Sequence, residues 1–258
     1  MTENRWSLVD RCSEGDILVA RNRTVGILGG MGPEATLELF RQIIALTPAR
    51  KDQDHLHIVI DSNPLIPDRT AAILEEDESP LPMMIKGARV LEQAGADFLV
   101  IPCNTAHHWL SHLRKAVSIP IIDMISETAT AIASCNPPIK AVGLLATMGT
   151  VNCGLYQQAL GDHDVSLLVS ADQEQARIMD AITHIKAGDH SLKGTVMAVA
   201  QHLIDQGASG IISGCTELSL VVKEAALSCP LFDPLSILAR RAVEWAKENS
   251  AQSQCLRY

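Results

Sequence analysis

Two of the seven cysteines stand in closely similar surroundings in the two halves of the chain. Cys103 follows the apolar segment Asp97–Pro102, and Cys215 follows Gly210–Ser213. Each is followed by a threonine, either directly or after one asparagine. A thiol whose pKa lies near neutrality can remove a proton in one direction of a reaction and return one in the other. Two thiols on opposite sides of one carbon would invert that carbon, so the pattern predicts racemisation or epimerisation.

The residues beside these thiols are suited to hold a carboxylate. Asn104, Thr105 and Thr216 offer side-chain and backbone donors, which can also stabilise negative charge that develops on a bound carboxylate. A helix that begins after each cysteine would place its positive end at the thiol, and we expect this to lower the thiol pKa toward neutrality. Other uses stay open. Both cysteines can be small buried residues at strand ends, or Cys103 can act as a nucleophile with His107 as its partner.

The two cysteines belong to a longer internal repeat. Three segments of the first half recur in the same order in the second half: Thr24–Gly29 as Ala141–Leu145, Leu91–Thr105 as Leu203–Thr216, and Val117–Asp123 as Leu227–Asp233. The offset between matched positions drifts only from 117 to 110 residues. Stretches with helical spacing, such as Glu34–Ala45 and Met83–Gln93, separate short apolar segments. We therefore predict an α/β fold of two pseudo-symmetric lobes, each a mainly parallel sheet flanked by helices, with the active site in the cleft between them.

The predicted boundaries follow this repeat. Residues 24–123, together with a C-terminal helix at 235–250, are expected to form the N-terminal lobe, and residues 124–234 the C-terminal lobe. Residues 1–23 are a polar leader for which the sequence indicates no function. Further strands are expected at His57–Asp61, Asp97–Pro102 and Ile119–Ile122.

The composition disfavours several classes of protein. Of 258 residues, 21 are Lys or Arg and 30 are Asp or Glu, which gives a formal net charge of −9, and aromatic residues make up 3%. Nucleic-acid binding needs clustered cations and stacking rings, so it is disfavoured. No apolar run is long enough to cross a membrane, and the first 23 residues lack the apolar core of a signal peptide. Seven cysteines without a CxxC pair favour reduced thiols, so we expect a cytoplasmic protein.

The sequence contains only weak cofactor motifs. Gly30–Ala35 (GMGPEA) fits the GxGxxA dinucleotide fingerprint after a strand. The acidic residue expected about 20 residues later is missing, since Asp61 lies 31 residues beyond Gly30. His55 and His57 alternate near a predicted strand, but no HExxH motif accompanies them. We therefore expect no nucleotide, no metal and no other cofactor. The remaining cysteines are expected to be structural: Cys12, Cys135, Cys153, Cys229 and Cys255.

Six short segments occur in the order found in one enzyme family: GILGGMGPEAT, DSNPLIPDRT, PCNTAH, GLLATMGT, IKAG and GCTE. With these segments the chain resembles the aspartate/glutamate racemase superfamily over about residues 24–245, and within it the cofactor-independent aspartate racemases that have two catalytic cysteines. The resemblance implies a two-lobed fold with its site in the cleft, and racemisation without pyridoxal phosphate, metal or nucleotide. It also implies a homodimer that acts on a small dicarboxylic amino acid.

Residue roles follow from the same resemblance. Cys103 and Cys215 match the two catalytic bases, with Cys215 acting on the L form and Cys103 on the D form. Arg69 and Lys186 match the cations that hold the side-chain carboxylate of aspartate. The groups matched to the α-carboxylate are Asn104, Thr105, Thr216 and the backbone around Met31.

From the residues alone, several of these roles have alternatives. Arg69 follows a Pro–Asp turn, so it is expected on a loop at the carboxyl edge of a sheet, where it can bind a carboxylate bidentately. It can equally be a solvated loop charge, or form an ion pair with Asp68 or Asp61. Lys186 can be a plain surface lysine. Glu217 can orient a thiol or the substrate amine, or it can cap a helix.

The resulting hypothesis is a pyridoxal-phosphate-independent amino-acid racemase that interconverts L- and D-aspartate with two cysteine bases. Glutamate racemisation, hydantoin racemisation and maleate isomerisation use a paired-cysteine cleft in the same superfamily, and they stay open. A small-ligand binding module without catalysis is the alternative from another class. Retention of both thiols weighs against it, because binding alone does not need two.

Overall fold

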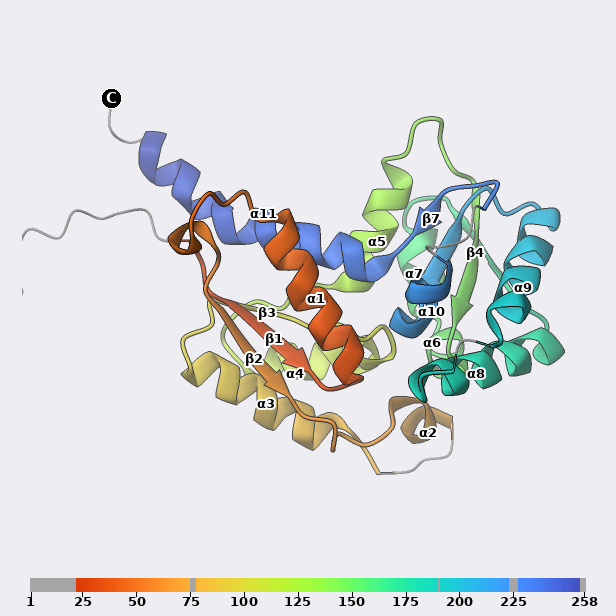
Figure 1. The fold of residues 1–258 in the computed structure, drawn as a ribbon, viewed down its shortest axis with the longest axis horizontal. Coiled ribbons are helices and arrows are strands. Elements are labelled where there is room, and N and C mark those ends of the chain that lie inside the picture. The colour runs from red at the N-terminus through yellow and green to blue at the C-terminus, as the bar shows by residue number, and fades with distance from the viewer. Residues whose placement is uncertain (1–21, 75–77, 190, 223–226, 256–258) are drawn as a thin grey trace, which may run out of the picture.

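In the computed structural model the chain forms two lobes, each built on its own parallel sheet (Figure 1). The structure describes residues 22–74, 78–189, 191–222 and 227–255. The first sheet has the order β2–β1–β3, with strands Val25–Gly29 (β1), Ile58–Ser62 (β2) and Phe98–Val100 (β3). The second has the order β5–β4–β6–β7, with strands Ala141–Ala146 (β4), Ser166–Val169 (β5), Ile211–Gly214 (β6) and Leu231–Phe232 (β7). The predicted two-lobed α/β fold is confirmed.

Helices cover both faces of the first sheet (Figure 1). They are α1 (Pro33–Leu46), α3 (Leu81–Gln93), α4 (Leu110–Ala116) and α11 (Pro234–Cys255). On one face, Leu39 of α1 and Leu238 of α11 pack with Ile27 of β1. On the other face, Leu91 of α3 and Leu113 of α4 pack in a second cluster. The last helix of the chain therefore packs on the first sheet, beside the first helix.

The second sheet is covered in the same way. Its helices are α5 (Met124–Ala133), α6 (Met148–Asn152), α7 (Leu155–Gly161), α8 (Asp172–Lys186), α9 (Lys193–Asp205) and α10 (Thr216–Val222). Ile182 of α8 and Leu203 of α9 pack with Ile211 of β6, whereas Tyr156 of α7 packs with Val142 of β4. Three short elements complete the fold: η1 (Asp52–Asp54), α2 (Arg69–Leu74) and η2 (Thr105–Trp109). No helix in the described ranges combines the length and apolarity needed to cross a membrane.

One expected strand, Ile119–Ile122, is reduced to a single parallel bridge between Ile121 and Leu99. Leu99 donates its N–H to the Pro120 carbonyl oxygen at 2.9 Å and accepts the Ile122 N–H at 3.0 Å. Pro120 has no N–H of its own, so it cannot extend this ladder. The matching segment of the second lobe does form a strand, β7, which pairs with β6.

The internal repeat extends to the order of the strands. The series β2–β1–β3 with the Ile121 bridge beside β3 corresponds to β5–β4–β6–β7. Strand β5 was not among the expected strands, because its four residues are partly exposed at the sheet edge. The lobe boundaries at 24–123, 124–234 and 235–250 stay a prediction. The leader at 1–23 lies outside the described residues, apart from Asn22 and Arg23.

The turn between β1 and α1 passes very close to the segment that follows β2. Gly30 has a φ of +90° and donates its N–H to Thr36 Oγ1 at 2.9 Å. A Cβ on Gly30 would lie 2.3–2.4 Å from backbone atoms of Asn63. The positive φ and the close approach together require glycine at this position. The tight turn thus accounts for the first glycine of the GMGPEA segment.

Gly30→Ala should destabilise the protein more than Gly154→Ala. Both glycines have positive φ, +90° and +62°, but no atom lies within 4 Å of a Cβ built on Gly154. Gly154→Ala should therefore lower the unfolding free energy by about 1–2 kcal/mol, through backbone strain alone. Gly30→Ala adds a backbone collision, which should cost a further ~1–3 kcal/mol. Urea unfolding of both variants measures the difference, and equal losses would contradict this account of the turn.

Candidate active site

The carboxyl ends of β3 and β6 open into one narrow chamber between the lobes. Cys103 lies three residues beyond the end of β3, Cys215 directly follows β6, and each is 7% exposed. Both line the chamber, which has a volume of about 30 Å³. Such a volume holds about two water molecules. All eight residues expected in the site line this chamber: Met31, Arg69, Cys103, Asn104, Thr105, Lys186, Cys215 and Thr216.

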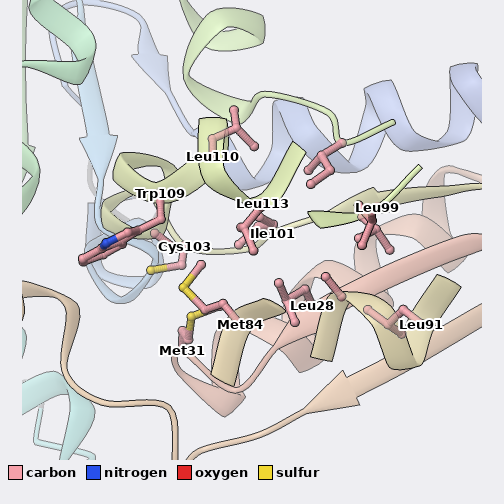
Figure 2. Close-up of a cluster of buried hydrophobic side chains, with 14 of the residues drawn as sticks. Leu28, Met31, Met84, Leu91, Leu99, Ile101, Cys103, Trp109, Leu110 and Leu113 are labelled. Carbon is pink, nitrogen blue, oxygen red and sulfur yellow. The ribbon is translucent and has the colours of Figure 1, made fainter. Parts of the chain in front are cut away.

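Cys103 lies at the end of the hydrophobic cluster on the α3 side of the first sheet. Figure 2 shows its side chain beside those of Met31 and Met84, with Trp109 on its other side. The Cys103 N–H donates to the Ile101 carbonyl oxygen at 2.8 Å, which fixes the backbone at the thiol. The first thiol therefore has apolar neighbours on one side and the polar chamber on the other.

His107 contacts the backbone of Cys103 rather than its thiol. The ring atom Nδ1 lies 2.8 Å from the Cys103 carbonyl oxygen, and Nε2 accepts the Met124 N–H at 3.2 Å. A ring that accepts at Nε2 is neutral and carries its proton on Nδ1. Burial also lowers the pKa of His107, which favours this neutral form. Both ring nitrogens are thus engaged with backbone, which argues against a hydrolase built on Cys103 and His107.

Cys215 is held as a thiol by its burial and by Glu217. The Sγ–H group donates to Glu217 Oε2 at 3.0 Å, and the Thr216 hydroxyl donates to the same oxygen at 3.1 Å. Burial raises the pKa of Cys215 well above its usual value, and the Glu217 carboxylate adds to this increase, while the Lys186 charge opposes it. The expected lowering of this pKa is therefore wrong. Desolvation of the buried thiol and the neighbouring carboxylate set this direction.

The two residues that follow the first thiol are held from the other lobe. Asn104 Oδ1 accepts the Tyr156 O–H at 2.6 Å, and Asn104 Nδ2 is buried without a hydrogen-bond partner among the described residues. Thr105 Oγ1 lies 3.1 Å from Thr147 Oγ1 and 2.8 Å from Thr150 Oγ1. These contacts join the segment after β3 to α6 and α7. Asn104, which lines the chamber, is left with an NH₂ group that has no acceptor among the described residues.

The sequence suggested that Arg69 lies on a loop, but Arg69 is the first residue of helix α2. Its Nη1 group donates to the carbonyl oxygens of Ile66 and Pro67, at 3.1 and 2.9 Å, and its Nε is buried without a partner within the described ranges. Asp68 Oδ1 accepts the two backbone N–H groups that follow Arg69, so this carboxylate caps the helix instead of pairing with the guanidinium. The guanidinium thus retains donors for a bound carboxylate.

Lys186 is the last residue of α8 rather than a residue between helices. Its side chain is exposed and lines both the chamber and an outer cavity of about 620 Å³, and Glu217 also lines both. The ammonium group lowers the pKa of Cys215, against the effect of Glu217. A plain surface lysine would not have this electrostatic contact with a thiol of the chamber.

Five further residues line the chamber: Asp68, Thr70, Thr147, Gly214 and Glu217. Of these, the sequence suggested only Glu217, and it left the role of Glu217 open. The internal repeat could have indicated Thr147 as a residue of the site, because Thr147 directly follows β4 as Gly30 directly follows β1. Asp68 and Thr70 flank Arg69, and no pattern of their own distinguishes them.

The remaining candidate ligands have other surroundings. Among the described residues, no group of three or more His, Cys, Asp or Glu side chains is placed to hold a metal ion. His57 Nδ1 lies 3.3 Å from Thr24 Oγ1. Cys135, Cys153 and Cys229 are free and half-buried. The side chains of Cys12 and Cys255 lie outside the described part of the chain.

Two parallel sheets related by an internal repeat, each with a thiol at a strand end in a shared chamber, define a class of two-lobed amino-acid racemases. The profile of the family described as Asp/Glu/Hydantoin racemase matches residues 28–242. The chain therefore belongs to this family and is an amino-acid racemase, as its motifs predicted. The homodimer and the cytoplasmic location expected from the sequence stay predictions.

Individual relatives agree with this assignment. The broad-specificity amino-acid racemase RacX of Bacillus subtilis is 33% identical over 228 residues, which cover 85% of this chain and 96% of RacX. The structure of the Picrophilus torridus aspartate racemase is 31% identical, with a TM-score of 0.77 over 88% of this chain and 97% of that one. The glutamate racemase of Francisella tularensis has a TM-score of 0.65 over 90% and 83% of the two chains. At 19% identity, that third likeness shows the fold alone.

Glu217→Gln should lower the pH at which Cys215 becomes reactive. The substitution removes the carboxylate charge that helps to raise the Cys215 pKa, so the thiolate forms at lower pH. Alkylation requires the thiolate, and its midpoint should therefore move to lower pH. Iodoacetamide labelling over a pH series, followed by mass spectrometry of the Cys215 peptide, measures this midpoint.

The Cys229 peptide is an internal control in the same samples. Burial alone raises the pKa of Cys229, and its labelling profile should not respond to Glu217→Gln. A Cys215 midpoint that stays in place or moves to higher pH would show that Glu217 does not hold the proton on this thiol.

Proposed function

We propose that this racemase interconverts L- and D-aspartate by a two-base mechanism that uses Cys103 and Cys215. The observation that carries the proposal is a single chamber lined by both thiols and by two cations, Arg69 and Lys186. A dicarboxylic amino acid between the thiols would find cations for its side chain and hydrogen-bond donors for its α-carboxylate. The 31% identity to the Picrophilus torridus aspartate racemase supports aspartate as the substrate.

The proposed reaction moves one proton on and one proton off the α-carbon. In the L-to-D direction, the Cys215 thiolate takes the α-hydrogen as a proton, and the electron pair stays on the α-carbon and its carboxylate. The Cys103 thiol then gives its proton to the opposite face, which leaves D-aspartate and a Cys103 thiolate. The D-to-L direction runs through the same steps in reverse. Nothing is oxidised or reduced, so the expectation that no cofactor is needed fits this balance and stays a prediction.

Burial and Glu217 together set the starting protonation of Cys215 in this scheme. Cys215 begins as a thiol, because burial and Glu217 raise its pKa. It must lose that proton before it can act as a base in the L-to-D direction. The Lys186 charge favours the thiolate that remains.

The carboxylates of the substrate are assigned to two groups of residues. We assign the side-chain carboxylate to Arg69 and Lys186. The α-carboxylate, on which negative charge develops during proton removal, needs donors in fixed positions, and we assign it to these residues: Asn104, Thr105, Thr216 and the backbone around Met31. Asn104 supports this assignment, because its buried Nδ2 lacks an acceptor in the described part of the chain.

A wider range of amino acids is the second candidate for the substrate. The outer cavity of about 620 Å³ shares Lys186 and Glu217 with the chamber, so a side chain longer than that of aspartate can extend toward it. The 33% identity to the broad-specificity racemase RacX points in the same direction. Chiral chromatography of reactions with L-aspartate, L-glutamate and longer L-amino acids distinguishes the two candidates.

Each single Cys→Ser substitution in the chamber should lower net racemisation of aspartate by about 10²–10⁴-fold, because serine is too weak a base to replace a thiolate. The remaining thiol can still exchange the α-hydrogen of one enantiomer with solvent. In deuterium oxide, Cys103→Ser should at most place deuterium in L-aspartate, and Cys215→Ser in D-aspartate. Chiral chromatography coupled to mass spectrometry measures both products.

The wild-type enzyme provides the reference for this experiment. Starting from L-aspartate, it should form D-aspartate that already carries deuterium, because the second thiol donates a proton derived from solvent. Cys229→Ser changes a half-buried thiol outside the chamber and should keep the wild-type rate. If Cys103→Ser or Cys215→Ser racemises aspartate near the wild-type rate, the two-thiol mechanism fails.

Arg69→Leu should lower kcat/KM for aspartate by a factor that corresponds to about 2–5 kcal/mol, because the substrate carboxylate would lose its buried charge partner. Alanine has no side-chain carboxylate, so the wild type should use it poorly and the variant no worse. Steady-state racemisation rates for both amino acids test this specificity.

Arg89→Leu is the matched control for the loss of one arginine. Arg89 is exposed, and its guanidinium donates to the Ala116 carbonyl oxygen at 3.3 Å, outside the chamber. This variant should keep wild-type kinetics. Aspartate kinetics within about twofold of wild type in Arg69→Leu would mean that Arg69 does not bind the substrate.

A further inference from the structure

Tyr156 lies behind the chamber and contacts the residue next to a thiol. Its side chain is 1% exposed and packs in the core of the second lobe with Val142 and Leu160. Its O–H donates to Asn104 Oδ1, in the first lobe, at 2.6 Å. Tyr156 itself is not among the residues that line the chamber. Its hydroxyl can therefore act on a ligand only through a neighbour, and its partner Asn104 is one that lines the chamber.

This hydrogen bond orients the Asn104 amide, and the Tyr156 hydroxyl also has a hydrogen bond with the Thr128 side chain. Burial raises the pKa of Tyr156, so its hydroxyl keeps the proton that it donates. While the carbonyl oxygen of the amide accepts that proton, the NH₂ group occupies the other branch of the side chain. Asn104 is 3% exposed and lines the chamber, and its Nδ2 has no hydrogen-bond partner among the described residues. A buried donor without an acceptor is costly, and an oxygen of a ligand would remove that cost.

The hydroxyl of the next residue is held from the same part of the second lobe. Thr105 Oγ1 contacts the hydroxyls of Thr147, which caps α6, and of Thr150, which lies within α6, one short turn before α7. Thr147 Oγ1 also accepts the Thr150 N–H at 3.2 Å, so the backbone of α6 fixes this hydroxyl. Residues 147–156 of one lobe thus orient two adjacent polar side chains of the other.

We propose that Tyr156 is a positioning residue that turns the NH₂ group of Asn104 toward the chamber, so that this part of the site selects a carboxylate over an ammonium group. The proposal rests on the proposed function, since the carboxylate concerned is the α-carboxylate of the amino acid. With the amide turned over, its carbonyl oxygen would face the ligand and repel a carboxylate. Tyr156→Phe keeps the ring and removes only the hydroxyl that prevents this.

Tyr156→Phe should raise the KM for aspartate about tenfold, because the hydrogen bond that is lost orients a group that binds the substrate. Asn104→Ala should raise KM at least as much. The double variant Tyr156→Phe/Asn104→Ala should have the KM of Asn104→Ala alone, since Tyr156 acts through Asn104. Steady-state kinetics of the four proteins give this cycle.

A second buried hydroxyl serves as the control. Thr47 donates its hydroxyl to the Ile43 carbonyl oxygen at 2.7 Å and does not line the chamber, so Thr47→Val should leave KM unchanged. Additive losses in the double variant would mean that Tyr156 acts through packing rather than through the amide. An unchanged KM in Tyr156→Phe would also overturn the proposal.

A readout that needs no turnover separates this proposal from the proposed function. The side-chain carbonyl carbon of Asn104 can be assigned by nuclear magnetic resonance, from the signal lost in Asn104→Ala. In Tyr156→Phe this signal should move upfield, because a hydrogen bond to a carbonyl oxygen deshields the carbon. If the shift occurs in a protein that does not racemise aspartate, the proposed function fails and the orientation of the amide stands. If the signal does not move, the role of Tyr156 fails for every substrate.

Discussion

Parallel strand pairing restricts where this protein can do chemistry. The central strands β1 and β4 each pair in parallel with neighbours on both sides, and helices cover both faces of each sheet. Only the strand ends remain for a ligand, and in parallel sheets the carboxyl ends lie together at one edge. Because the second lobe repeats the strand order of the first, β3 and β6 lead to cysteines at equivalent places. The shared chamber follows from bringing these two edges together.

The repeat makes the two thiols equivalent in position, but the residues after them differ. Asn104 and Thr105 correspond to Thr216 and Glu217. Thr105 contacts hydroxyls of the other lobe, whereas Glu217 turns back to Cys215 and helps to raise its pKa. A racemase must both take and give a proton, so one base must be a thiolate and the other a thiol at the moment when the α-hydrogen is removed. The difference between the two segments gives the free protein a defined starting state, in which Cys215 carries its proton.

The sequence was sufficient for what local pattern and repetition encode, and insufficient for contacts between distant segments. Apolar runs bounded by Gly and Pro predict the central strands, and the repeat predicts that both thiols share a site. Tyr156 lies 52 positions from Asn104, and no local spacing connects them. The pKa of Cys215 was predicted in the wrong direction, because a helix end is visible in the sequence whereas burial depends on packing. Arg69 begins a helix because the Asp68 carboxylate accepts the N–H groups of Thr70 and Ala71. In the sequence, this helix cap looks the same as a Pro–Asp turn.

The small size of the chamber connects substrate binding to proton transfer. A volume of about 30 Å³ is too small for an amino acid, so we expect lining side chains to move when a substrate enters. Lys186 is exposed and stands where the chamber adjoins the outer cavity, so its long side chain can move without disturbing the core. A substrate carboxylate in the chamber would meet the Lys186 charge together with that of Arg69. The same ammonium group lowers the pKa of Cys215. In the proposed mechanism, this one cation therefore both binds the substrate and favours the thiolate that removes its proton.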